Sequence, residues 1–179
     1  MFRWMASAQT RVGPVAAFAY LVDPRHAGEW FARVEAREVP PGPLRAGRAW
    51  VFYEPAARSI KPVRLTIYDK PRRFVWETRL PRPRTNLVWE YEFAPTPDHG
   101  ATLTFTLRWR PSPLGLPLAL AAVLLSRGAL ARRTQATIER ARDALEAAYP
   151  ARGARPSADD DSASTPPGQQ PGARRRGRR

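Results

Sequence analysis

Apolar and polar side chains alternate with a period of two along much of the sequence. From residue 85 to 95, Leu87, Trp89 and Tyr91 fall on one side of an extended chain, and Glu90 and Glu92 fall on the other. Such alternation is typical of a strand with one buried face. It predicts about seven strands, at residues 2–12, 34–39, 50–53, 63–68, 74–80, 85–95 and 101–110. Because the two faces differ in polarity, we expect an antiparallel sheet that is covered on one side only.

Helical spacing replaces this alternation in three places. Gly13 and Pro14 introduce a short helical run, because proline suits the first turn of a helix. Asp23 followed by Pro24 predicts a second short helix toward Trp30, with the aspartate as its cap. A long amphipathic helix is predicted over residues 116–149 from an apolar stripe that returns every seven residues. The main members of this stripe are Leu124, Ala131, Ile138 and Leu145.

The composition changes abruptly at Pro150. From there to the end the chain has no aromatic residue and no Leu, Ile, Val or Met. Such a segment cannot bury enough apolar surface to offset the entropy lost on ordering. We therefore expect a folded domain at residues 1–149 and a disordered basic tail at 150–179, which ends in the residues RRRGRR.

The chain is strongly basic, with a formal net charge of +14. All but two of its 30 basic side chains are arginines, the exceptions being Lys61 and Lys70. This bias suggests genome-wide base composition more than selection for one partner. A weak contact with an anionic membrane or with nucleic acid, through the arginines and the tail, is nevertheless consistent with the charge.

Several classes of chemistry are excluded by composition. The chain has no cysteine and only two histidines, His26 and His99, which rules out disulfides, thiolate chemistry and a histidine-rich metal site. No glycine-rich phosphate loop occurs, and no Ser-His-acid set can be assembled. We therefore expect neither a metal nor a cofactor. The absence of a long apolar run and of a secretion signal predicts a cytoplasmic protein without a transmembrane segment.

The apolar face of the predicted sheet is unusually rich in large aromatic side chains, whereas the helix stripe that would cover it is largely alanine. Two arrangements follow. A curved sheet around one helix leaves space for a small molecule, or the large and small side chains interdigitate into a filled core. The residues alone favour neither arrangement.

Several short motifs, in order, resemble a known superfamily. Residues 12–18, Asp23-Pro24 with Trp30, residues 43–48, residues 70–76 (P-x-R-F-x-W) and residues 100–104 resemble the helix starts, turns and strand starts of START/Bet v1-like (SRPBCC) proteins, with Ala101 in place of a usual threonine. The likeness is greatest to the polyketide cyclase/dehydrase and lipid-transport branch. It implies an α+β helix-grip fold. In that fold a curved antiparallel sheet wraps around a long C-terminal helix, and two short helices follow the first strand.

This resemblance implies a cavity for a hydrophobic ligand between sheet and helix. Our leading hypothesis is binding, with transport as an extension, of a lipid-like or aromatic, polyketide-like molecule. Arg127 either meets an acidic group of the ligand or reaches solvent. The residues expected to line the cavity are Trp50, Phe52, Trp76, Trp89, Tyr91, Phe93, Phe105, Trp109, Leu124, Arg127 and Ile138.

Two alternatives remain open. The first is a cyclase- or dehydrase-type enzyme, for which Tyr91 is the candidate catalytic residue because a phenol can exchange a proton or hydrogen-bond a carbonyl. The competing interpretation is an ordinary core tyrosine. The second alternative is a peripheral membrane or polyanion-binding module that uses the apolar segment 114–125, Arg132, Arg133 and the tail.

Overall fold

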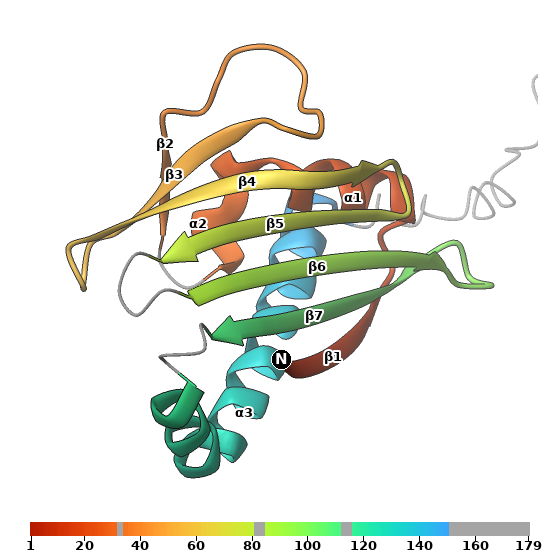
Figure 1. The fold of residues 1–179 in the computed structure, drawn as a ribbon. Coiled ribbons are helices and arrows are strands. Elements are labelled where there is room, and N and C mark those ends of the chain that lie inside the picture. The colour runs from red at the N-terminus through yellow and green to blue at the C-terminus, as the bar shows by residue number, and fades with distance from the viewer. Residues whose placement is uncertain (32–33, 81–84, 112–115, 151–179) are drawn as a thin grey trace, which may run out of the picture.

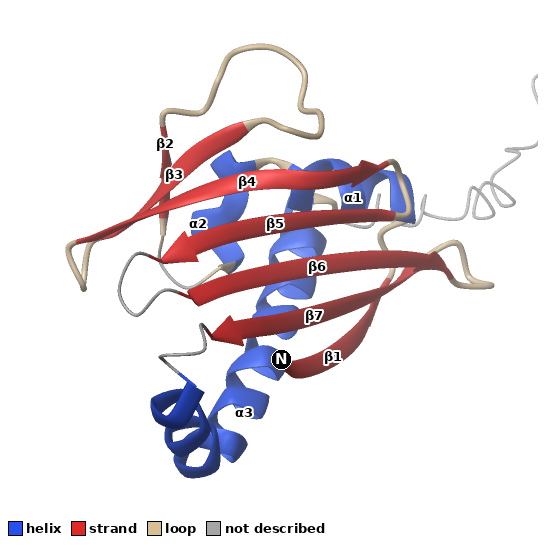
Figure 2. Ribbon diagram, viewed as in Figure 1, coloured by secondary structure: helices blue, strands red, loops and turns tan. Residues whose placement is uncertain are grey.

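The computed structural model describes residues 1–31, 34–80, 85–111 and 116–150, with side chains not described at 80, 116–119 and 122–127. A seven-stranded antiparallel sheet, in the order β1-β7-β6-β5-β4-β3-β2, forms one layer, and the helices form the other (Figures 1 and 2). The elements are β1 (Phe2–Thr10), α1 (Pro14–Val22), the 3₁₀ turn η1 (Pro24–His26), α2 (Ala27–Trp30), β2 (Glu35–Arg37), β3 (Ala49–Glu54), β4 (Ser59–Asp69), β5 (Arg73–Leu80), β6 (Thr85–Pro95), β7 (Ala101–Pro111) and α3 (Leu116–Ala148).

The predicted fold class is confirmed. A curved antiparallel sheet, short helices after the first strand and one long C-terminal helix all occur in the expected order. The second short helix is a 3₁₀ turn followed by a single α-helical turn, and Asp23 caps it by accepting a hydrogen bond from the Arg25 backbone N–H at 2.9 Å. The predicted strand at 63–68 is longer in the structure, because β4 begins at Ser59 and includes Pro62.

The first and last strands lie side by side. β1 pairs with β7 along its whole length, from Phe2 opposite Trp109 to Thr10 opposite Ala101. Helix α3 crosses the inner face and packs mainly against β1, with further contacts to β7 and α2. In Figure 2 α1, α2 and most of α3 lie behind the sheet, so the opposite face of the sheet is not covered by them. No helix in the described ranges is long and apolar enough to cross a membrane.

The buried stripe of α3 differs in part from the predicted one. Thr134, Ile138, Ala141 and Leu145 are buried and hold the C-terminal half of the helix on the sheet. Ala131, which the seven-residue spacing placed in the stripe, is exposed instead. An α-helix advances by 3.6 residues per turn, so a strict seven-residue repeat drifts off the face that meets the sheet.

A side-chain contact fixes the far end of this helix. Glu146 accepts hydrogen bonds from the Thr10 hydroxyl at 3.1 Å and from the Arg11 backbone N–H at 3.3 Å. The end of β1 and the last turns of α3 are thereby tied together. The first turns of α3, dark green in Figure 1, lie beyond the other end of the sheet.

Candidate ligand-binding site

A cavity of about 340 Å³ lies between the sheet and α3. It lies toward the end of the sheet where β6 begins and β7 ends. Its volume falls within the range of small-molecule sites, which is roughly 300–1,000 Å³. Among the described residues, the lining consists of Trp4, Thr85, Leu87, Trp89, Leu107, Trp109 and Leu130.

The strand register explains why these side chains meet. Trp4, Leu107 and Trp89 are direct partners across β1, β7 and β6, so they form one row on the inner face. Trp109 and Leu87 form the next row toward the strand ends. Alternation along each strand sends every one of these side chains toward the helices, because successive residues point to opposite faces.

Two polar groups of this lining, those of Trp109 and Thr85, have partners. The indole N–H of Trp109 donates to the Thr85 hydroxyl, which in turn donates to the Arg110 backbone carbonyl at 3.3 Å. No titratable side chain is among the lining residues that the structure describes. The wall therefore offers apolar and aromatic surface, and it suits an apolar ligand rather than a charged one.

The rest of the same inner face, which we call the filled end, is closely packed, although its Trp76 lies directly opposite Trp89 of the cavity lining. Tyr91 stacks between Phe74 and Phe105, with ring centroids 4.8 Å and 4.7 Å away. Trp30, which α2 carries, stacks on Trp76 at 5.7 Å. The side chains of this cluster bury almost all of their surface, so here large rings interdigitate as in an ordinary core.

Tyr91 lies inside this filled end. Its side chain is 1% exposed, and its hydroxyl has no hydrogen-bond partner among the described residues. Burial raises the pKa of the Tyr91 phenol well above its usual value, because the charged form would lose its hydration. At neutral pH the hydroxyl therefore keeps its proton. It is not part of the described lining of the cavity.

The predicted ligand-binding residues separate into three groups. Trp89 and Trp109 line the cavity. The side chains of Leu124 and Arg127, on α3, lie outside the described residues. The remaining residues are buried in the filled end: Trp50, Phe52, Trp76, Tyr91, Phe93, Phe105 and Ile138.

Sequence reasoning missed several lining residues. Leu87 and Leu107 stood on the apolar face of the predicted strands, and Trp4 stood on the apolar side of the first. Their alternation marks them as inward-facing, but it does not distinguish a cavity wall from a packed core. Leu130 lies one position away from the seven-residue stripe, but it stands four residues before Thr134 and eight before Ile138, and this helical spacing is a signal for it.

A polar cluster fastens the short helices of the filled end. Tyr20 of α1 donates a hydrogen bond to Glu29 of α2, and His26 Nδ1 lies 2.9 Å from the other Glu29 oxygen. The hydrogen bonds from Tyr20 and from His26 lower the pKa of the Glu29 carboxyl. The Tyr20 and His26 rings also stack, with centroids 4.3 Å apart. This cluster does not contribute to the described cavity lining.

The profile of one protein family matches most of the chain. The family is described as polyketide cyclase/dehydrase and lipid transport, and the match covers residues 1–149. The chain belongs to this family. The family resemblance drawn from the short motifs is therefore confirmed. Membership in this family supports a fold that binds hydrophobic ligands.

Solved structures share the fold of this polyketide cyclase/dehydrase and lipid transport domain. A protein of unknown function from Staphylococcus aureus superposes with a TM-score of 0.62 at 12% identity, covering 82% of this chain and 94% of that one. A protein from Chromobacterium violaceum gives 0.56 at 14% identity, covering 80% and 96%. DynU16, a putative protein in the dynemicin biosynthetic locus, gives 0.53 at 13% identity, covering 82% and 48%.

These likenesses show the fold alone, because the identities are low. Among curated proteins, none matches the sequence.

Proposed function

We propose that the protein binds a hydrophobic small molecule in the cavity between the sheet and α3. The observation that carries the proposal is the apolar space of about 340 Å³ beside three tryptophans. A concave, mostly apolar surface of this size is the usual form of a small-molecule site.

The lining indicates the class of ligand. Trp4, Trp89 and Trp109 offer flat aromatic surfaces, while the Thr85 hydroxyl is already engaged by Trp109 and Arg110. A ligand with an aromatic or lipid-like body fits these walls. An engineered apolar cavity of about 150 Å³ accepts benzene. The space here therefore suits a molecule larger than one aromatic ring.

Binding is favoured over catalysis. The described lining contains no acid or base that could move a proton, and general acid–base chemistry requires one within hydrogen-bond reach. The alternative of a cyclase- or dehydrase-type enzyme rests on family membership and on Tyr91 as its candidate residue. Catalysis through Tyr91 would require a ligand to reach the filled end of the domain.

The experiment is a titration with a neutral fluorescent probe such as N-phenyl-1-naphthylamine, after native mass spectrometry of the purified chain. We expect a co-purified apolar molecule or saturable binding of the probe. Leu87→Phe places a ring in the cavity and should weaken binding of the probe by about tenfold. Val15→Phe, at an exposed position, should leave probe binding unchanged. Absence of saturable binding, or equal loss in both variants, would exclude the cavity as a ligand site.

We propose in addition that the protein is cytoplasmic. We also propose that it releases its ligand at an anionic surface. Arg132 and Arg133 are exposed on α3, close in sequence to the cavity-lining Leu130. Weak contact with an anionic membrane or with nucleic acid through these arginines should fall steeply as salt rises. Co-sedimentation with anionic vesicles at low and high salt tests it, and binding that ignores salt would contradict it.

A further inference from the structure

The outer face of the sheet carries an uneven distribution of charge. Strand register places Arg64, Glu77, Val88, Arg108 and Arg3 in one row across the sheet. The adjacent row toward the strand ends contains Arg79, Asn86 and Arg110. These two rows hold five arginines and a single acid, and we call them the basic half of the outer face.

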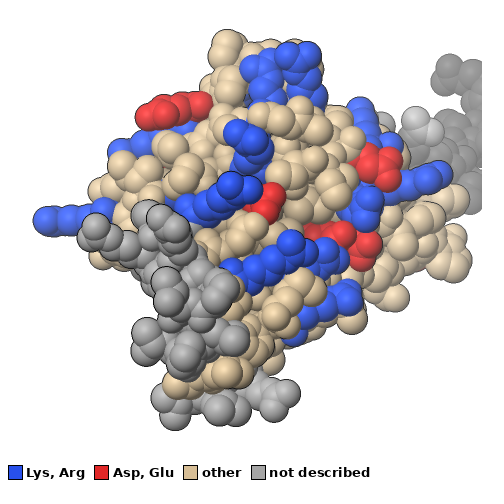
Figure 3. All heavy atoms as spheres, viewed as in Figure 1, with Lys and Arg blue, Asp and Glu red and all other residues tan. Residues whose placement is uncertain are grey.

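The remaining rows of this face differ in charge. They contain Glu90, Glu92 and Asp69 but a single arginine, Arg73. Glu90 is almost fully buried and forms ion pairs with Arg73, at 3.6 Å, and with Arg108. Figure 3 shows this face, with basic side chains over the sheet and the acidic ones gathered between some of them. In these remaining rows the acidic and basic side chains therefore compensate each other, whereas the basic half keeps an excess of positive charge.

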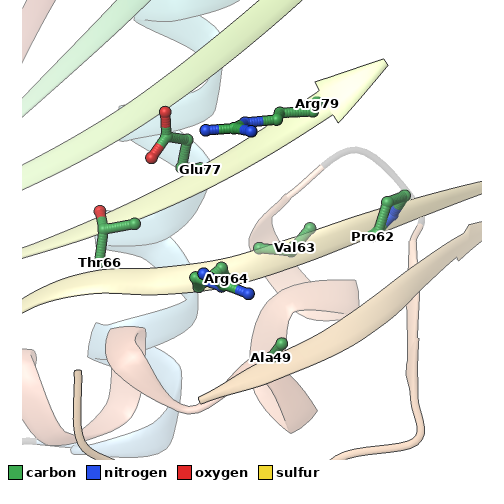
Figure 4. A pocket seen from close by; sticks show the side chains of 7 residues that line it. All are labelled: Ala49, Pro62, Val63, Arg64, Thr66, Glu77 and Arg79. Carbon is green, nitrogen blue, oxygen red and sulfur yellow. The ribbon is translucent and has the colours of Figure 1, made fainter. Parts of the chain in front are cut away.

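A groove of about 320 Å³ lies within the basic half, over β3, β4 and β5 (Figure 4). Arg64 and Arg79 supply its positive charge, and neither forms an ion pair with a described residue. The small side chain of Ala49 and the ring of Pro62 provide apolar walls. The groove is separated from the candidate ligand cavity by the sheet itself.

Glu77 forms no ion pair with either of these arginines among the described residues. It lies directly opposite Arg64 in the register, yet its carboxylate accepts a hydrogen bond from the Asn86 side-chain amide of β6 instead. In Figure 4 the Arg79 side chain extends along β5 toward Glu77, and Arg64 stands on the neighbouring strand. The groove therefore presents two guanidinium groups, with one carboxylate held at its edge by a neutral amide.

We propose that this groove is a second binding site, which takes the phosphate group of a small molecule. A guanidinium presents parallel N–H donors that match phosphate oxygens, so Arg64 and Arg79 grip the anion from adjacent strands. Ala49 and Pro62 contact the carbon part of the ligand. The phosphate belongs either to a lipid headgroup or to a soluble phosphate ester, and both present the same chemistry to the groove.

The first test is a titration of the full chain with inorganic phosphate. Binding is monitored through the amide NMR signals of β3, β4 and β5. These signals distinguish the groove from the arginines of the tail. Binding should be saturable, and Arg64→Gln and Arg79→Gln should each weaken it about fivefold or more. Arg142→Gln removes the same charge from an arginine paired with Asp143 on α3 and should change nothing. Unshifted groove signals, or equal loss in the Arg142 variant, would overturn the proposal.

The second test uses the carboxylate. Glu77→Gln keeps a polar side chain near Asn86 but removes the negative charge, so phosphate should bind several-fold more tightly. Glu92→Gln, on the same face but two rows away, is the matched control and should have a smaller effect. If the two variants behave alike, phosphate responds to overall charge and the groove is not a site.

Two further ligands identify the source of the phosphate. Glycerol 3-phosphate represents a soluble ester, and vesicles that contain phosphatidic acid represent a headgroup. Tighter binding of either one than of inorganic phosphate, lost in the Arg64 and Arg79 variants, supports the site and assigns its ligand. If neither ligand binds more tightly than inorganic phosphate, the result contradicts the proposed contact with Ala49 and Pro62.

Discussion

The two ends of the inner sheet face are built from the same kinds of residue and end up differently. The chain's six tryptophans divide evenly, with Trp30, Trp50 and Trp76 in the filled end and the others beside the cavity. In the filled end, α1 and α2 insert Phe18 and Trp30 between the rings of the sheet. At the other end, Leu130 of α3 is the helical side chain that the structure describes in the lining.

This contrast shows that a hollow site need not be made by special residues. Where short helices deliver large rings, the aromatic face becomes an ordinary core. Where a single helix spans the curved sheet, the same face leaves space. The position of the short helices therefore decides where a ligand fits, and variants at matched positions can test the difference.

The largest expected difference is between two tryptophans that face each other across adjacent strands. Trp76 and Trp89 are direct register partners, but Trp76 lies in the filled end and Trp89 lines the cavity. Trp76→Ala should lower the free energy of unfolding by about 3–5 kcal/mol, because it empties a packed aromatic site. Trp89→Ala should cost distinctly less and alter probe binding. Chemical denaturation measures both, and equal costs would mean that the two ends are equally packed.

A smaller effect of opposite sign is expected from Tyr91→Phe. The hydroxyl of Tyr91 is buried without a described partner, and such a group costs stability in the folded state. Its removal should raise the free energy of unfolding by about 1 kcal/mol and leave probe binding unchanged. Loss of binding or of any turnover would show that the ligand reaches into the filled end, as the cyclase hypothesis requires.

A comparable or smaller gain is expected from Gly128→Ala in α3. Glycine inside a helix costs roughly 0.5–1 kcal/mol relative to alanine. Among the described residues, a methyl group there would meet the end of the flexible Arg132 side chain, at 3.4 Å. Thermal unfolding should therefore shift upward, with probe affinity retained. A destabilised variant would indicate that the helix needs its glycine to follow the hollow end of the sheet.

The smallest effect concerns the fastening of the short helices by Glu29. Its pKa is lowered in the folded protein, so its contribution is present above the unfolded pKa of about 4.3 and is lost as the pH falls through the folded value. Glu29→Gln should therefore reduce the melting temperature slightly at pH 7, and the difference from the unsubstituted protein should shrink as the pH is lowered through the folded pKa. Glu92→Gln is the control, and an identical pH profile for the two variants would contradict the assignment.

Most of the fold could be predicted because its signals are local. Alternation in residues 85–95 and 101–110 fixes which side chains face inward, and the prolines at 14 and 24 mark the helix starts. The site depends on distant contacts instead. That Trp30 would insert beside Trp76 follows from the path of a short helix across the sheet. No periodicity in its own segment encodes that path. Leu130 and not Ala131 meets the cavity, because the packing of α3 on the sheet, and not the seven-residue spacing, sets which side of the helix faces inward.

The pairing of β1 with β7 has a consequence for the order in which the domain assembles. Trp4 meets Leu107 across more than 100 intervening positions of the chain, whereas β5, β6 and β7 pair with their sequence neighbours. Contacts between such distant segments pay a larger loop-closure entropy and form late. β1 is also an edge strand of the sheet. We therefore expect this wall of the cavity to form later and to fray more readily than the central strands, so amide exchange should be faster near Trp4 than in β5 and β6.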